Sequence, residues 1–86
     1  MGSRKAIEAQ GDCFLERLEY SRAMKHYLVA YMLEGDCIAY VHALSNSVGV
    51  CCRRLGCMLS SRWWFRLAKD QGNEYAHRNL ARLELF

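Results

Sequence analysis

Cysteine and histidine are the side chains of this 86-residue chain that are best suited to metal binding. Cys51, Cys52 and Cys57, together with His42, could supply thiolate and imidazole ligands for a zinc ion. Structural zinc sites, however, take cysteines in two spaced pairs, and the adjacent Cys51 and Cys52 suit one tetrahedral ion poorly. The pattern favours buried or incidental thiols, so neither a metal site nor a cofactor is predicted.

A nucleophilic cysteine beside a histidine is the second chemistry to consider. Cys37 and His42 are five residues apart, a spacing that does not require their side chains to face each other on one helix. No acidic partner or oxyanion loop accompanies them in the sequence. The glycines stand singly, so no phosphate-binding loop is expected. The chain is therefore predicted not to be an enzyme.

Basic residues offer a third possibility. Arg62, Arg66 and Lys69 recur at helical spacing, and Trp63 lies next to the first of them. Such a surface could contact phosphates while the indole stacks on a base. Neighbouring acidic residues dilute it, and the net charge is only +3. Nucleic-acid binding is therefore the alternative hypothesis and not the principal one.

Helices must position these residues, because the chain has no proline and its apolar and small residues recur every three or four positions. Five helices are expected, over about 3–17, 20–33, 36–51, 60–71 and from 74 onward. Gly35–Asp36 and Gly72–Asn73 should each end one helix and cap the next. Residues 51–60 are expected to form a longer connection.

The sequence shows neither a membrane span nor a secretory signal. No apolar run approaches the about 18 residues of a membrane span. The first twelve residues lack the apolar core of a secretory signal. A cytoplasmic protein with reduced cysteines is the expectation.

Small and aromatic residues recur as they do in paired antiparallel helices. The trio Ala23, Tyr27, Ala30 corresponds to a second trio, Ser61, Phe65, Ala68. A further alignment, from Ala6 through Ala39 to Ala76, gives periods of 33 and 37 residues and pairs Gly11 with Leu44. Packing positions are expected to include Ala6, Ala9, Gly11, Phe14 and Leu18 in the first helix, and Ala39, Ala43, Leu44 and Val48 in the third.

The first hairpin resembles a tetratricopeptide repeat, through Gly11, Phe14, Ala23, Tyr27 and Ala30. The second half is similar to the Sel-one-like variant, through Trp64–Phe65, Ala68, Gln71–Gly72–Asn73, Ala76 and Leu80–Ala81. The resemblance implies an all-α fold of about two and a half hairpin repeats, with five helices in a right-handed stack. It covers a single domain, residues 1–86. The helix-ending proline of many such repeats is missing.

The resemblance also implies a function: a non-catalytic protein-interaction module, or a small chaperone or adaptor. In tetratricopeptide arrays the first helix of each hairpin lines a concave groove, which here would hold an amphipathic helix or an extended segment. The groove residues implied by the repeat alignment are Lys5, Glu8, Asp12, Ile38, Val41, Ser45, Val48, Tyr75, Arg78 and Arg82. Ala9 stands where the family's carboxylate clamp needs Asn, so recognition of chaperone tails is not expected.

Interface anchors are expected outside the groove as well. Trp63, Leu83 and Phe86 are candidates, because large apolar side chains dominate many protein interfaces. An apolar last helix without a cap implies a partner, self-association through that helix, or truncation of a longer protein. In size the chain resembles the small chaperones of bacterial secretion systems, which hold an amphipathic helix of a partner subunit.

Overall fold

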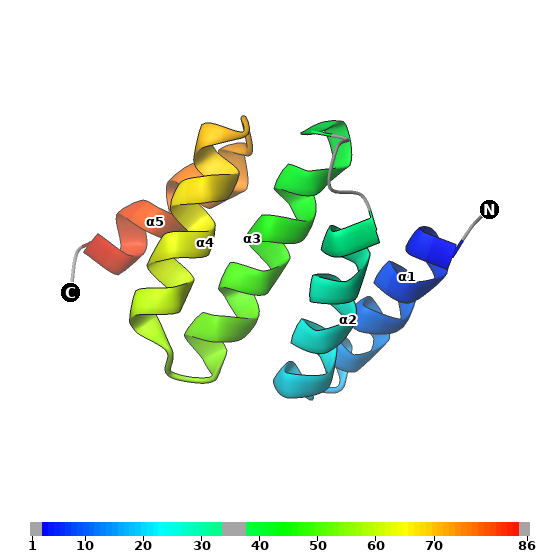
Figure 1. Ribbon diagram of the computed structural model, residues 1–86. Helices are drawn as coiled ribbons and strands as arrows, with labels where there is room; N and C mark the ends of the chain where they lie inside the picture. Colours follow the sequence, from blue (N-terminus) through cyan, green and yellow to red (C-terminus); the bar gives the residue numbers. More distant parts are fainter. Residues whose placement is uncertain (1–2, 34–37, 85–86) are drawn as a thin grey trace.

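Five α-helices make up the computed structural model, which describes residues 3–33 and 38–84 (Figure 1). They are α1 (Ser3–Glu16), α2 (Tyr20–Leu33), α3 (Ile38–Arg54), α4 (Met58–Asp70) and α5 (Glu74–Glu84). The predicted all-α fold of helical hairpins is confirmed. The predicted cap Asp36 lies outside the described residues. None of the described helices is both long and apolar enough to cross a bilayer.

The helices pack mainly on their neighbours along the chain. In Figure 1, α3 lies between α2 and α4. Helix α1 lies behind α2, and α5 lies behind α4. The arrangement is thin, with Cα extents of 41 × 27 × 16 Å. The central helix α3 is therefore covered on two sides, by α2 and α4, while α1 packs mainly on α2.

A glycine facing an aromatic ring brings the two helices of each hairpin together. A methyl group added at Gly11 would stand 2.9 Å from the Tyr27 ring, and one added at Gly49 would stand 2.6 Å from the Phe65 ring. Both contacts are shorter than van der Waals distance, so only glycine allows this approach. Small residues beside the rings complete the contact: Ala23 and Ala30 in α2, Ser61 and Ala68 in α4.

These contacts correct the predicted repeat period. Gly49 occupies the place of Gly11, and it lies 38 residues further along the chain. The same interval separates Tyr27 from Phe65, whereas Leu44, the predicted counterpart of Gly11, is a buried core residue. The prediction that paired Gly11 with Leu44 at a period of 33 is therefore wrong. Four predicted packing positions are exposed instead: Ala6, Ala9, Leu18 and Ala43.

Three tight turns of one kind connect α1 to α2, α3 to α4, and α4 to α5. In the second, the Cys57 N–H donates to the Cys52 carbonyl at 2.8 Å and the Gly56 N–H to the Arg53 carbonyl at 3.1 Å. This is a Schellman motif, in which the residue after the helix takes a positive φ. That residue is Leu18 (φ 63°), Gly56 (φ 85°) or Gly72 (φ 100°). The longer connection predicted for residues 51–60 is wrong, because α3 runs to Arg54 and α4 begins at Met58.

Asn73 fixes the start of α5 against α3. Its side-chain oxygen accepts from the Ala76 N–H at 2.9 Å, which confirms the predicted capping role. Its side-chain nitrogen donates to the His42 carbonyl at 3.4 Å. The Asn79 amide also donates to Asn46 at 3.1 Å. Polar contacts thus couple the first turns of α5 to the middle of α3.

Candidate functional site

A cleft forms where the C-terminal ends of α3 and α5 meet the first turn of α4. The tight turn after Arg54 brings Arg53, in the last turn of α3, close to Met58, the first residue of α4. Arg62 follows Met58 one helical turn later, and Leu83 reaches the same place from the last turn of α5. These four residues line a cavity of about 340 Å³, hereafter the cleft.

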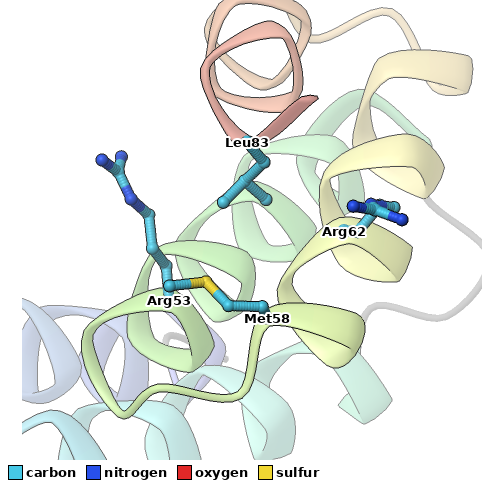
Figure 2. A pocket seen from close by; sticks show the side chains of 4 residues that line it. All are labelled: Arg53, Met58, Arg62 and Leu83. Carbon is cyan, nitrogen blue, oxygen red and sulfur yellow. The ribbon is translucent and has the colours of Figure 1, made fainter. Parts of the chain in front are cut away.

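The cleft combines an apolar base with positively charged sides. In Figure 2, Leu83 points from α5 toward Met58, with Arg53 on one side and Arg62 on the other. The volume lies at the lower end of the about 300–1,000 Å³ typical of ligand sites, enough for one or two side chains. Methionine adapts its shape to different apolar groups, which suits it to a binding surface.

The two arginines of the cleft have no ion-pair partner in the described part of the chain. Among the described side chains, no carboxylate lies within ion-pair distance of either Arg53 or Arg62. By contrast, Arg22 at the start of α2 lies 3.2 Å from Glu19. The described residues of the cleft therefore form an electropositive surface.

A stripe of exposed apolar side chains lies beside the cleft on α4. Leu59 and Trp63, one helical turn apart, are 80% and 59% exposed, and Met58 is 51% exposed. Trp63 stands edge-to-face on Trp64 with ring centroids 4.9 Å apart, and Trp64 packs in the same way on Tyr31 of α2. The partly buried Trp64 thus holds the indole of Trp63 in place while leaving it 59% exposed.

The predicted groove residues of α1 are accessible but partly engaged within the chain. Lys5 is exposed. Glu8 is half-buried and pairs with Arg4 at 3.3 Å. Asp12 is exposed, and its carboxylate accepts a hydrogen bond from the Tyr27 hydroxyl. Asp12 therefore anchors the ring that packs on Gly11.

Three predicted groove residues of α3 are buried, and their assignment to an exposed stripe is wrong. Val41, Ser45 and Val48 are at most 2% exposed. Val48 packs in the core between α2 and α3. The Ser45 hydroxyl lies 3.0 Å from both the Val41 carbonyl and the Gln71 side chain. The reason is topological, because a helix with neighbours on both sides has no free face at these positions.

The remaining predicted residues divide into three groups. Tyr75, Arg78, Arg82 and Trp63 are exposed, as a binding role requires. Leu83 is only 9% exposed because it packs in the apolar cluster with Phe65 and Leu80, and its remaining surface lines the cleft. The side chain of Ile38 and the whole of Phe86 lie outside the described part of the chain.

The basic residues of the nucleic-acid hypothesis lie on the outer side of α4. Arg62, Arg66 and Lys69 are exposed, and Trp63 is exposed beside them. Arg62 belongs to the cleft, and Asp70 is exposed directly after Lys69. The helix therefore presents mixed charge toward its C-terminal end and positive charge toward its N-terminal end.

The thiols do not form a metal site in the described residues, which contain no group of three or more His, Cys, Asp or Glu side chains able to hold an ion. Cys51 and Cys52 are buried, and Cys13 and Cys57 are exposed. Burial raises the pKa of the Cys51 thiol to about 11, with a smaller contribution from Cys52. Burial likewise raises the pKa of Cys52, and the nearby Cys57 adds to the shift.

The long connection predicted for residues 51–60 does not place Arg53 next to Met58, so the cleft is not expected from the sequence. A usable signal was present. Gly49, Ser61 and Phe65 repeat the spacing of Gly11, Ala23 and Tyr27, which fixes the length of the α3–α4 turn at that of the α1–α2 turn. Arg53 and Met58 then fall at the ends of one short turn.

A smaller hollow of about 230 Å³ lies on the outer side of the α1–α2 hairpin. It is lined by Ile7, Gln10, Lys25, His26 and Val29. Its lining has a single lysine where the cleft has two arginines, so the cleft is the more strongly charged candidate. No protein-family model matches the chain, and comparisons with curated proteins and with solved structures give no significant match.

Proposed function

We propose that the chain is a non-catalytic protein-binding module whose cleft holds one apolar side chain of an acidic amphipathic segment. The observation that carries this proposal is the pairing of an apolar base, Met58 and Leu83, with two arginines that have no ion-pair partner among the described side chains. An apolar residue of the partner would enter between the arginines. Carboxylates on either side of it would then meet the guanidinium groups.

The stripe next to the cleft supports the same proposal. Leu59 and Trp63 extend the apolar surface along α4 for about one further helical turn. A partner helix or extended segment long enough to reach from the cleft to the indole would bury both side chains. Tryptophan and arginine are the residue types that most often carry the binding energy of an interface.

The proposal also includes membership of a helical-repeat family and a location in the cytoplasm. The glycine, small-residue and aromatic spacings shared by the two hairpins support kinship with tetratricopeptide or Sel-one-like repeats, whose members bind proteins. A small chaperone or adaptor in the cytoplasm, such as those of secretion systems, is the role that fits this kinship. Association through the surface of α5 is a further part of the same proposal.

The test is binding of a fluorescein-labelled synthetic helical peptide in which a central leucine is flanked by glutamates one helical turn away on each side. We expect saturable binding that an otherwise identical peptide with lysines in place of the glutamates does not show. Arg62→Glu should weaken binding by at least about tenfold, since it reverses one of two charges in direct contact. Arg17→Glu, which reverses an exposed charge in the α1–α2 turn, is the matched control and should leave affinity unchanged.

A single-stranded oligonucleotide in the same assay decides between the two classes of partner. Tight oligonucleotide binding that falls steeply with salt and is lost in Arg62→Glu would support the nucleic-acid hypothesis and contradict the present one. Equal binding of the glutamate and lysine peptides would also contradict it, because charge complementarity would then have no effect.

A further inference from the structure

Two cysteines stand at the ends of the turn that forms the edge of the cleft. Cys52 is in the last turn of α3, and Cys57 immediately precedes α4. The Cys57 N–H donates to the Cys52 carbonyl at 2.8 Å, which is the outer hydrogen bond of a Schellman motif. Cys52 is therefore at the C3 position of the motif and Cys57 at the C″ position. The side chains at these two positions are the ones that characteristically contact each other in this motif.

This pairing is particular to the α3–α4 turn. The equivalent positions hold Phe14 and Glu19 in the α1–α2 turn, and Ala68 and Asn73 in the α4–α5 turn, each joined by the same backbone hydrogen bond at 2.9 Å. Of the three turns described, this one alone has a thiol at both positions. The effect of Cys57 on the pKa of Cys52 agrees with their proximity.

We propose that Cys52 and Cys57 form a reversible disulfide across the α3–α4 turn. The two thiols differ in access: Cys57 is exposed, whereas Cys52 is 4% exposed and its Sγ lies 3.7 Å from Met24 Sδ of α2. This difference assigns the order of reaction. Cys57 is the thiol that meets an oxidant, and Cys52 is the thiol that resolves the adduct.

The oxidant is a small-molecule disulfide of the glutathione type. The Cys57 thiol loses its proton to solvent, and the resulting thiolate attacks one sulfur of the oxidant. This attack forms a mixed disulfide and releases one thiol. The Cys52 thiolate then attacks the Cys57 sulfur, so that the protein disulfide forms and the second thiol leaves. Two protein thiols are oxidised, and one small disulfide is reduced to two thiols.

Oxidation changes which helix Cys52 contacts. In the reduced chain its sulfur rests on Met24 and so belongs to the α2–α3 contact. In the oxidised chain the sulfur turns toward Cys57 and becomes part of the α3–α4 turn. Arg53 and Met58 are each next to one of the two cysteines, and both line the cleft. The disulfide would therefore restrain one side of the cleft at Arg53 and its base at Met58.

Mass spectrometry of the full chain after incubation with oxidised glutathione tests the proposal. Trypsin cuts after Arg53 and Arg54, between the two cysteines, so the peptides on either side stay joined only by a disulfide. Fragmentation of the joined pair, repeated in the Cys51→Ser variant, separates a Cys52 link from a Cys51 or Cys37 link. We expect a Cys52–Cys57 link that Cys13→Ser and Cys51→Ser both retain.

The resolving step has its own test in Cys52→Ala, which keeps a small apolar side chain in the core. The mixed disulfide on Cys57 should persist at least about tenfold longer in this variant than in the unmodified chain. Equal persistence in both chains, a link from Cys57 to a cysteine other than Cys52, or absence of any link would overturn the proposal. None of these readouts involves a partner, so the outcome is independent of the binding function proposed above.

Discussion

The hairpins α1–α2 and α3–α4 share one backbone frame but differ in what surrounds it. Cys13 and Cys51, 38 residues apart, occupy equivalent positions, yet the first is exposed and the second is buried. Gln10 is likewise exposed, and its counterpart Val48 is completely buried. The difference arises because α3 has a packed neighbour on each side, whereas α1 packs mainly on α2. Place in the stack, more than residue type, decides burial here.

The central aromatic contact shows a second difference. In the first hairpin the Tyr27 hydroxyl donates to Asp12, so the ring is tied to α1 by a polar contact. In the second, Phe65 has no such group, and α4 is tied to α3 by the Ser61 hydroxyl, which donates to the Gly49 carbonyl at 2.8 Å. Burial, followed by the Asp12 hydrogen bond, raises the pKa of Tyr27 well above its usual range. The same glycine–aromatic contact is thus accompanied by a different hydrogen bond between the helices in each hairpin.

The largest effect is expected from adding a methyl group at the two glycines. In Gly49→Ala the new carbon would stand 2.6 Å from two atoms of the Phe65 ring, which is buried on all sides, so α3 and α4 must separate. We expect a loss of about 3 kcal/mol in the free energy of unfolding, at the upper end for overpacking. In Gly11→Ala the closest contact is 2.9 Å, at the edge of a hairpin with one open side, and a loss of about 1 kcal/mol is expected. Urea unfolding followed by circular dichroism measures both.

Equal losses in the two variants would contradict the idea that the central hairpin is the more tightly constrained one. A Gly49→Ala,Phe65→Leu double variant provides the control. Because leucine leaves room beside the new methyl group, the second substitution should cost less in the Gly49→Ala background than alone.

A smaller effect separates the two equivalent cysteines at alkaline pH. The pKa of Cys51 is about 11 in the folded chain, against a usual value of 9.0. The protonated thiol is therefore favoured by folding: this stability is fully present below pH 9 and is lost as the pH rises through 11. We expect the free energy of unfolding to fall by on the order of 2 kcal/mol over that window, and less in Cys51→Ala.

Cys13→Ala is the matched comparison, because it removes a thiol that is exposed in the folded chain. Its pH profile should follow that of the unmodified chain. Tyr27 contributes to the profile of every variant at the alkaline end, so the difference between the variants, measured by thermal unfolding from pH 7 to 11, is the informative quantity. Identical profiles for Cys51→Ala and Cys13→Ala would show that the buried position is not distinguished from the exposed one.

The smallest effect concerns the turn residues with positive φ. Leu18 adopts φ 63°, a conformation that costs an L-residue roughly 1 kcal/mol, whereas its counterpart Gly56 adopts φ 85° without that cost. Leu18→Gly should therefore raise the free energy of unfolding by about 0.5 kcal/mol, after allowance for the greater freedom of glycine in the unfolded chain. Gly56→Ala should lower it by about 1 kcal/mol, and since nothing lies within 4 Å of the added carbon, backbone strain is the sole cause. Changes of the same sign in both variants would argue against this explanation.

The helices could largely be predicted from the sequence, because small and aromatic residues at helical spacing determine how a hairpin packs. The Ala23–Tyr27–Ala30 and Ser61–Phe65–Ala68 contacts follow directly from that spacing. The cleft could not be predicted while the length of the α3–α4 turn was misjudged, since Arg53 and Met58 meet only across a short turn.

The burial of Val41 and Val48 was missed for a different reason. An apolar face on one helix indicates that something covers it, but not whether the cover is a partner or another part of the same chain. Here α3 is covered by its own neighbours. Three residues of the cleft, Arg53, Met58 and Leu83, lie in the first or last turns of their helices, where periodicity carries little information.

Because each helix contacts mainly the helices next to it in sequence, most native contacts join residues that are close along the chain. Chains of such low contact order search little conformational space before they fold, and folding within milliseconds is the usual result. In the same arrangement, local stability differs from helix to helix along the stack. Amide hydrogens of α3 should exchange most slowly with solvent, and those of α1, which packs mainly on α2, should exchange earlier.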